Sequence, residues 1–416
     1  MREREFVAAV QGAGGRVFLV GGAVRDMMLE LQAGDRDYMV SGLTEETFTT
    51  LFPKAIRVGK SFPVYLQKID GRKCEVAFAR RERKTGRGYR GFVTFSDTTV
   101  TPEEDLVRRD LTMNSLALEL PERKLLDPCG GAADIKRHLI RANSEHFAED
   151  PVRALRAARF AARYEFTVTE GTLSLMRSQA EELQDEPSER IMHELTLALK
   201  CRRPSLFFRV LDAAGLLAAV FPEIARLKGK TQPIAYHPEG DAFEHTMQVV
   251  DKAAALTENV TARFAALAHD LGKGTTPTEM LPHHYDHERR GLTVIDEWNR
   301  RVTLPLNWRK AAKFVIREHM RAPRLKKNNK IVDLLQSIKN GVLPPRDFNA
   351  CILADHGSLP VYLAEQGKFL AALLAVNGSD VPPNLSGAAI GAWVRAQQAA
   401  AVAKLKYELT KEDISQ

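Results

Sequence analysis

The stretch V-F-L-V-G-G-A-V-R-D at Val17–Asp26, continued by G-D-R-D-Y-M-V at Gly34–Val40, decides the fold of this chain. Four apolar, mostly strand-favouring residues open it, and a glycine pair then allows a tight turn into a helix. Arg25 and Asp26 follow at the start of that helix. We therefore expect a strand, a glycine turn and a helix, followed by a second strand.

The second part of this stretch carries a pair of carboxylates, Asp35 and Asp37, separated by a single residue. Alternate residues of a strand face the same side, so both carboxylates share a face if this segment is a strand. Mg²⁺ prefers hard oxygen ligands and commonly takes carboxylates together with substrate phosphates. The pattern therefore suits Mg²⁺ that carries a nucleoside triphosphate, and the alternative is a charged strand end beside a helix cap.

Further motifs follow in a fixed order. The segment R-R-D-L-T-M-N-S-L-A-L spans Arg108–Leu118, and E-D-P-V-R-A-L-R-A-A-R-F spans Glu149–Phe160. Together with the glycine pair and Asp-x-Asp, they resemble the class II tRNA nucleotidyltransferases and their bacterial poly(A) polymerase relatives. The resemblance implies an α/β head of the nucleotidyltransferase, polymerase β-like type.

In such a head, Asp35 and Asp37 would be catalytic and would hold Mg²⁺. The glycine pair would let the backbone approach the triphosphate, and arginines would add charge-assisted contacts to it. Asn114 is either a ligand contact or a structural hydrogen bond. The nucleotide-binding residues implied by the resemblance are Gly21, Gly22, Arg25, Arg109, Asp110, Asp150, Arg153, Arg156 and Arg159.

The resemblance also implies that Asp150 and Arg153 select the base. A carboxylate accepts from the exocyclic amine of cytosine or adenine, and a guanidinium donates to the neighbouring ring nitrogen. Guanine and uracil present the reverse order, which leaves buried groups unpaired. From the spacing alone, the two residues share a helix face, and an intrahelical salt bridge is the alternative. Arg156 and Arg159 would reach the phosphates.

Shorter segments fit the same family. The basic run R-R-E-R-K-T-G-R-G-Y-R-G-F (80–92) is similar to the flexible loop of CCA-adding enzymes, and its alternative is a solvated hairpin loop. V-G-K-S-F-P-V-Y (58–65) is closer to the tRNA enzymes than to poly(A) polymerases. S-E-R-I-M-H-E-L (188–195) is similar to a helix that supports the neck, so we expect its charged residues to be structural.

The second half contains H-P-E-G-D-A-F-E-H-T (237–246) and A-L-A-H-D-L-G-K-G (266–274). These histidines, with a distant aspartate, resemble an HD phosphohydrolase domain, so the chain resembles the bacterial CCA-adding enzymes that carry one. Imidazole and carboxylate suit a divalent transition metal or Mg²⁺ that activates water for phosphoester hydrolysis. The implied ligands are His245, His269, Asp270 and Asp355, while His283, His284 and His287 either line the site or lie in an exposed loop.

The composition is that of a globular chain of 416 residues, 44% apolar and 27% charged. No apolar run approaches the ~20 residues that span a bilayer. The start M-R-E-R-E-F lacks the apolar stretch of a signal peptide, and the scattered cysteines form no C-x-x-C. We therefore expect a cytoplasmic protein without a membrane or thiolate-zinc role. The net charge of +7 suits a phosphate-rich partner.

Strand patterns fade beyond the first third of the chain, where Ala- and Leu-rich helical periodicity takes over. We expect an α/β head followed by an all-α neck and body and an α-helical HD domain. The predicted divisions are a nucleotidyltransferase head (1–140), a helical neck and body (141–228), an HD phosphohydrolase domain (229–360) and a helical tail (361–416).

The function implied by the resemblance is template-independent addition of C, C and A to tRNA 3′ ends from CTP and ATP with Mg²⁺. An additional HD phosphohydrolase activity is implied by the second half. An A-adding tRNA enzyme and a poly(A) polymerase are alternatives with the same chemistry. An HD phosphohydrolase with an inactive head is the alternative of a different class.

Overall fold

The structure is a computed structural model that describes residues 1–32, 34–58, 63–84, 92–376 and 380–414. Of the predicted segments, part of the basic run (85–91) and part of the 58–65 motif (59–62) lie outside these residues. No helix within the described ranges combines the length and apolar character that crossing a bilayer requires.

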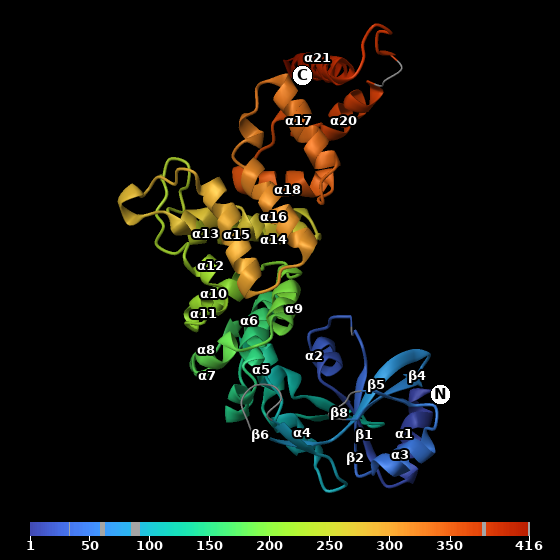
Figure 1. The fold of residues 1–416 in the computed structure, drawn as a ribbon. Helices are drawn as coiled ribbons and strands as arrows, with labels where there is room; N and C mark the ends of the chain where they lie inside the picture. Colours follow the sequence, from blue (N-terminus) through green and yellow to red (C-terminus); the bar gives the residue numbers. More distant parts are fainter. Residues whose placement is uncertain (33, 59–62, 85–91, 377–379, 415–416) are drawn as a thin grey trace. The chain divides into compact units, whose positions relative to one another are not determined.

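The chain divides into two compact units. The first comprises Met1–Glu194 with Leu206–Val220, and the second comprises Leu195–Ser205 with Phe221–Gln416. The colours of Figure 1 follow the chain through both of them. The expected fold class, a mixed α/β head followed by helical domains, is confirmed. The finer division into four domains stays a prediction.

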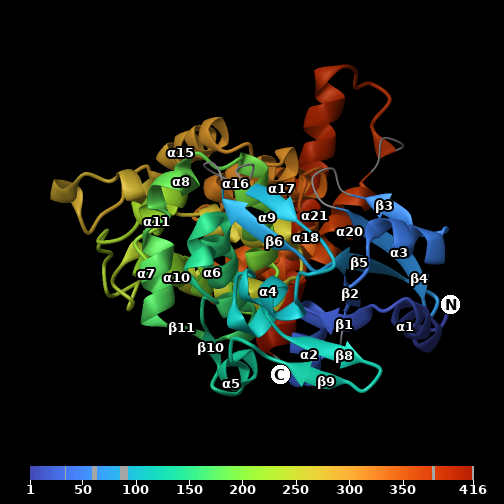
Figure 2. The same ribbon diagram turned by 90° about the horizontal axis from the view of Figure 1, so that it is seen from below.

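A seven-stranded sheet in the order β3-β4-β5-β2-β1-β8-β9 forms the centre of the first unit (Figure 2). Strand β1 pairs antiparallel with β2 and β8, whereas β2 pairs parallel with β5. Two further pairs, β6–β7 and β10–β11, form small separate sheets. The strands are β1 (Arg16–Val20), β2 (Asp37–Ser41), β3 (Ile56–Val58), β4 (Val64–Ile69), β5 (Arg72–Phe78), β6 (Arg81–Lys84), β7 (Phe92–Phe95), β8 (Ala117–Leu120), β9 (Lys124–Leu126), β10 (Leu139–Ile140) and β11 (Thr167–Val168).

The central strands are buried on both faces, which explains why V-F-L-V is a continuous apolar run. On one face, Phe18 and Met39 belong to an apolar cluster that includes Leu106. On the other face, Tyr38 packs edge-on against Phe6 of helix α1, at 5.7 Å between ring centroids. Burial on both sides therefore fixes the register of β1 and β2.

The expected strand, glycine turn and helix are present. Strand β1 ends at Val20, Gly21 has a φ of +64°, and α2 begins at Gly22. A positive φ favours glycine, so the turn depends on this residue type. The helices that end in the first unit, or continue from it, are α1 (Glu3–Gly12), α2 (Gly22–Met28), α3 (Glu45–Leu51), α4 (Pro102–Val107), α5 (Gly131–Lys136), α6 (Val152–Tyr164), α7 (Glu170–Arg177), α8 (Ala180–Gln184), α9 (Ser188–Leu199), α10 (Ser205–Ala213) and α11 (Leu217–Val220).

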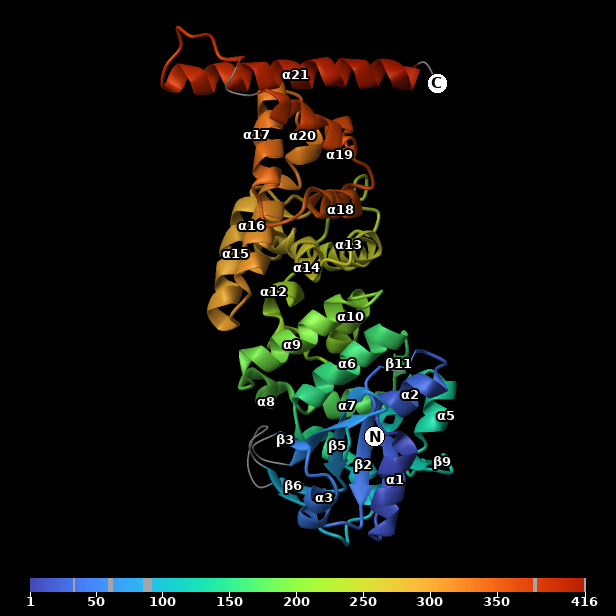
Figure 3. The ribbon, with the colours of Figure 1, turned by 90° about the vertical axis from the view of Figure 1, so that its right-hand side faces the viewer.

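The second unit is helical. An apolar cluster joins α13, α14, α16, α17 and α18 with the helices that follow them, and the long α21 packs against α17 and α20 (Figure 3). The helices are α12 (Pro222–Ala225), α13 (Ala242–Leu256), α14 (Val260–Ala268), α15 (His287–Arg301), α16 (Leu306–Glu318), α17 (Asn328–Lys339), α18 (Pro345–His356), α19 (Val361–Ala364), α20 (Gln366–Ala375) and α21 (Ala388–Ile414).

One glycine tests the packing of α5 against the segment that contains Thr112. A Cβ at Gly131, the first residue of α5, would lie 2.1 Å from the carbonyl oxygen of Thr112. Gly131→Ala should therefore destabilise the head by about 1–3 kcal/mol, the usual cost of overpacking. Thermal unfolding should show a lower midpoint, whereas Gly12→Ala, at a helical position with no atom within 4 Å of its Cβ, should not lower it. Equal midpoints for both variants would contradict the packing.

Candidate functional site

A cavity of about 430 Å³ lies in the first unit, beside the turn that links β1 to α2. Its wall combines the glycine turn, carboxylates of the sheet and a set of arginines, which is the composition expected for an anionic ligand with a metal ion. Of the described residues predicted for this site, Asp35 and Arg159 do not line the cavity. Those that do are Gly21, Gly22, Arg25, Asp37, Arg109, Asp110, Asp150, Arg153 and Arg156.

Asp37 and Glu75 form the carboxylate pair of this cavity. Asp37 begins β2 and pairs in register with Glu75 of β5, and both line the cavity. Burial and the neighbouring acids Glu75 and Asp35 raise the pKa of Asp37 to about 6, although Arg109 lowers it. A cation between these carboxylates would relieve their repulsion. We did not predict Glu75, although an acid within the otherwise apolar strand C-E-V-A-F was its signal.

Asp35 and Asp37 would share a face only if both lay in the strand, and the structure does not meet this condition. Strand β2 begins at Asp37, which pairs with Val20, the last residue of β1. Asp35 lies before the strand, exposed in a bend. The preceding Gly34 does not extend the strand. Asp35 nevertheless lies close enough to act electrostatically on Asp37.

Several arginines of the cavity are held by buried acids. Asp105, 2% exposed, accepts from Arg109 Nη2 at 2.9 Å and from Arg108 Nη2 at 2.6 Å. Arg25 is also buried, and its guanidinium donates to Asp26 and to Asn114 Oδ1. Asn114 therefore makes a structural hydrogen bond, which was one of the open alternatives. Arg109 lines the cavity while it is held by Asp105. The guanidinium of Arg25 also lines the cavity, but it is hydrogen-bonded to Asp26 and Asn114.

Asp110 is buried where η1, a short 3₁₀ helix at Thr112–Asn114, begins. It accepts from Arg156 Nε at 2.7 Å and from Asn114 Nδ2 at 3.0 Å. Burial opposes its charge, yet these donors hold the pKa of Asp110 well below its usual range. Asp110 therefore acts as a fixed negative charge that orients Arg156.

Asp150 and Arg153 do not form the intrahelical salt bridge that their spacing allowed. Asp150 precedes α6, where it accepts from the backbone N–H of Val152 and from Arg190 Nη2 at 2.8 Å. Arg153 donates to the carbonyl of His146 at 2.8 Å. Both side chains line the cavity but are held by separate partners. Arg190, which we expected only to support the neck, is the ionic partner of Asp150.

The prediction that Arg159 reaches the phosphates disagrees with its position. Arg159 is 6% exposed, and its Nε lies 2.5 Å from Glu194 Oε2 on α9. This buried ion pair fixes α6 against α9, because each charge compensates the other. Arg156, one turn earlier, is the residue that faces the cavity.

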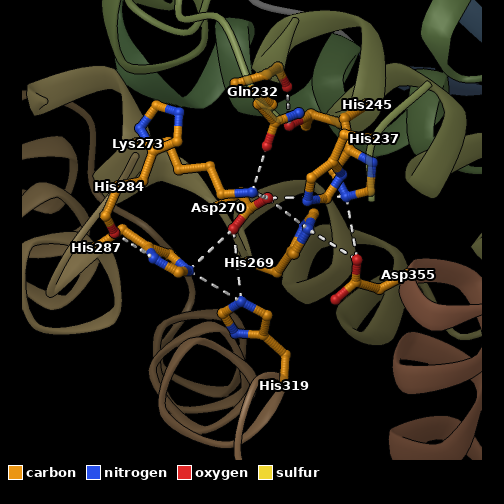
Figure 4. Close-up of polar contacts among 12 residues, drawn as sticks. Gln232, His237, His245, His269, Asp270, Lys273, His284, His287, His319 and Asp355 are labelled. Carbon is orange, nitrogen blue, oxygen red and sulfur yellow. Dashed lines mark hydrogen bonds and ion pairs between the residues drawn. The ribbon is translucent and has the colours of Figure 1, made fainter. Parts of the chain in front are cut away.

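A second cavity, of about 770 Å³, lies in the second unit. Beside it, the four residues predicted as ligands meet in space (Figure 4). His245 of α13 places Nε2 at 3.0 Å from Asp355 Oδ1 of α18. His269 and Asp270, which follow α14, lie 3.1 Å apart between Nε2 and Oδ2. Asp355, although distant in sequence, therefore belongs to the cluster.

Two more histidines complete the cluster. His287 Nε2 lies 3.3 Å and His319 Nε2 lies 3.5 Å from Asp270 Oδ1, on the side opposite its Oδ2 partners (Figure 4). His319 lies in R-E-H-M, which carries no motif. Of the histidines left open, His284 bonds Thr276 and the Thr231 carbonyl, and His283 stacks on Tyr285. Only His287 of those three is therefore a candidate ligand.

Backbone carbonyls orient three of these imidazoles. The Nδ1 atoms of His269, His287 and His319 lie 2.7–3.0 Å from the carbonyls of Ala266, His284 and Ile316. A carbonyl only accepts, so each Nδ1 carries a hydrogen, and Nε2 is the atom through which the neutral ring could bind a metal ion. These Nε2 atoms face the carboxylate of Asp270 (Figure 4).

The donor set fits divalent metal. Possible ligand atoms of His245, His269 and Asp270 lie within 4.8 Å of one another, as do those of Asp270, His287 and His319. In the described part of the chain, His269 Nε2 and Asp270 Oδ1 are buried without a hydrogen bond of good geometry. Asp270 belongs to both groups, so it would be a shared ligand if two ions bind.

Lys273 places a buried cation against the same carboxylate. Its Nζ lies 2.6 Å from Asp270 Oδ2 and 2.5 Å from Gln232 Oε1, and the residue is 5% exposed. Burial opposes the charge of Asp270, but His269 and Lys273 hold the pKa of Asp270 well below its usual range. Lys273 was present in the predicted H-D-L-G-K motif, although we assigned it no role.

Three regions of the chain match models of known protein families. Residues 17–141 match the "Poly A polymerase head domain", residues 165–228 match the "Probable RNA and SrmB- binding site of polymerase A", and residues 242–341 match the "HD domain". Most residues around the first cavity lie in the head match, with Asp150–Phe160 beyond it, and the second cavity combines residues of the HD match with residues on either side of it.

Curated relatives match most of the chain. The "Multifunctional CCA protein" of Thioalkalivibrio sulfidiphilus is 41% identical over 412 residues, which is 94% of this chain and 99% of the relative. That of Ralstonia nicotianae is 47% identical over 312 residues, 73% of this chain and 72% of the relative.

Solved structures share the fold. The Bacillus stearothermophilus CCA-adding enzyme in complex with CTP has a TM-score of 0.66 at 23% identity, with 98% of each chain covered. The Thermotoga maritima CCA-adding enzyme complexed with tRNA has a TM-score of 0.59 at 20% identity, with 98% of this chain and 94% of that chain covered.

The histidine cluster leads to a test of metal content. His319→Ala should weaken binding of one Ni²⁺ per chain by at least about tenfold, because one group of donors loses an imidazole. Isothermal titration of the full chain with Ni²⁺, compared between wild type and variant, measures this loss. His283→Ala, which removes a ring stacked on Tyr285, should bind as wild type does. An unchanged His319→Ala titration would remove His319 from the centre.

Proposed function

Because the chain belongs to the family of multifunctional CCA proteins, we propose that it is a cytoplasmic enzyme that adds C, C and A in turn to tRNA 3′ ends. CTP and ATP are the proposed substrates, with Mg²⁺ in the first cavity. The observation that carries this proposal is the meeting of Asp37 and Glu75 with the glycine turn and Arg109 around that cavity.

The residues of this cavity would have different roles in phosphoryl transfer. Asp37 and Glu75, with Asp35 at the bend beside them, would hold Mg²⁺, which supplies charge neutralisation of the triphosphate and activation of the primer hydroxyl. Gly21, with its positive φ, lets the backbone approach the phosphates at the start of α2. Arg109, held by Asp105, would contact the triphosphate from the other side.

Base selection would rest on Asp150 and Arg153, which both line the cavity. Each side chain is held by another residue, Asp150 by Arg190 and Arg153 by the His146 carbonyl. A carboxylate and a guanidinium fixed in this way suit the amine and ring nitrogen of C and A, whereas G and U would leave them unpaired. Arg190 would thus support selection by fixing its partner.

For the second cavity, we propose metal-dependent hydrolysis of small phosphoesters such as 2′,3′-cyclic nucleotides. His245, His269, Asp270 and Asp355, joined by His287 and His319, would hold one or two divalent ions. Bound metal supplies an activated water and polarises the phosphoryl group. Lys273, beside Asp270, would add positive charge where a phosphate enters.

The catalytic assignment has a direct test. Asp37→Asn should slow addition of both C and A by at least about a hundredfold, because each ~1.4 kcal/mol of lost charge stabilisation is tenfold in rate. Affinity for tRNA should stay near wild type in a filter-binding assay. Asp70→Asn, which changes an exposed carboxylate outside the cavity, is the matched control. Parallel loss of tRNA binding and turnover would instead indicate a structural role.

Selection is tested at Asp150. Asp150→Ala should slow addition of C and A together and lower the preference for CTP over UTP, because one carboxylate reads the amine of both bases. Single-turnover incorporation of each nucleotide measures this. Glu189→Gln, an exposed neighbour of Arg190, is the control. Unchanged rate and fidelity in Asp150→Ala would refute the side-chain template.

Independence of the two activities is tested in the second unit. His269→Ala combined with Asp270→Ala should abolish hydrolysis of 2′,3′-cyclic nucleotides in Ni²⁺, Mn²⁺ or Mg²⁺, because both removed groups are proposed ligands. Addition of C and A should stay within a few-fold of wild type, since each unit has its own core. Loss of both activities would show that the sites are coupled.

A further inference from the structure

One imidazole of the cluster is oriented differently from the others. The Nδ1 atoms of His269, His287 and His319 bond backbone carbonyls three residues earlier in the chain. For His245 the corresponding carbonyl, that of Ala242, instead accepts from the hydroxyl of Thr246 at 2.8 Å. The orientation of His245 must therefore come from another acceptor.

That acceptor is Glu239. Its Oε1 lies 2.6 Å from His245 Nδ1, and its side chain is 9% exposed. It comes from the H-P-E-G motif, where Gly240, with a φ of +72°, forms a turn whose N–H donates to the His237 carbonyl. The same carboxylate oxygen lies 3.2 Å from His237 Nδ1.

We propose that Glu239 is a positioning residue that prepares His245 to bind metal, an inference that rests on the phosphohydrolase role proposed above. By accepting from Nδ1–H, Glu239 would leave Nε2 as the atom through which the neutral ring binds a metal ion. That Nε2 faces Asp355 Oδ1 at 3.0 Å and Asp270 Oδ2 at 3.8 Å. The carboxylate charge also makes the imidazole a stronger donor to a metal ion.

The geometry offers one rival. His237, Glu239 and His245 could themselves hold an ion, because their possible ligand atoms lie within 4.8 Å of one another. In that arrangement His245 would bind metal through Nδ1 rather than Nε2. The two arrangements differ at His237, which is a ligand in the rival but a second partner of the carboxylate in the proposal.

The experiment measures Ni²⁺ dissociation constants of the full-length chain by isothermal titration. The Ni²⁺ concentration that half-activates hydrolysis of a 2′,3′-cyclic nucleotide is the second readout. Glu239→Ala removes the acceptor, whereas Glu239→Gln keeps an acceptor oxygen without its charge. Glu288→Gln is the matched control, because Glu288 lies 3.5 Å from His287 Nδ1 while the His284 carbonyl lies nearer, at 2.9 Å. Metal-free thermal unfolding of each variant reports folding.

Glu239→Ala should raise the dissociation constant and the half-activating concentration by about 10–100-fold, the usual effect of removing such a partner. Glu239→Gln should raise both less, because its amide oxygen still accepts. Glu288→Gln should match wild type, and His237→Ala should keep every bound ion. Wild-type affinity in Glu239→Ala, an equal loss in Glu288→Gln, or loss of an ion in His237→Ala would each overturn the inference.

The two proposals fail in different ways. A wild-type chain that binds no divalent metal would overturn the phosphohydrolase proposal together with this inference. In the other case, the wild-type chain binds Ni²⁺ while well-folded Glu239→Gln and Glu239→Ala variants bind it equally tightly. That result would overturn the positioning role alone.

Discussion

Burial of negative charge is the constraint on which both sites depend. A carboxylate removed from water must be surrounded by donors or cations, because an uncompensated charge is very costly. Asp110 meets this requirement through Arg156 and Asn114, which together shape the first cavity. Asp270 meets it through Lys273 and surrounding histidines in the second. In each unit, the groups that satisfy one buried acid are also the groups that face the cavity.

Local patterns predicted much of this arrangement because their chemistry is contained in a few consecutive residues. A glycine pair after an apolar strand permits few backbone paths, so the turn at Gly21 followed from the sequence. The same holds for His269 and Asp270, which are adjacent at the end of a buried helix. Asp355 was reached only through family resemblance, and the structure brings it to His245.

The remainder depended on partners distant in sequence. Glu75 is a single acid in an apolar strand and His319 is a single histidine in a segment without a motif. Only strand pairing and helix packing bring them to Asp37 and Asp270. Spacing also misled where a boundary intervened, because β2 begins too late to include Asp35. Hydrogen-bond partners decide orientation, and they are chosen by tertiary packing that a one-dimensional pattern does not contain.

The central claim is that one fixed set of side chains in the first cavity accepts C and A and refuses G and U. The most direct measurement incubates the wild-type chain with Mg²⁺, all four nucleotides and tRNA that ends at the discriminator base, at CC or at CCA, and sequences the 3′ ends. The account predicts completion to CCA from each shorter end, and no extension of the complete one. Runs of A, addition of A alone, or incorporation of G or U at comparable rates would contradict it.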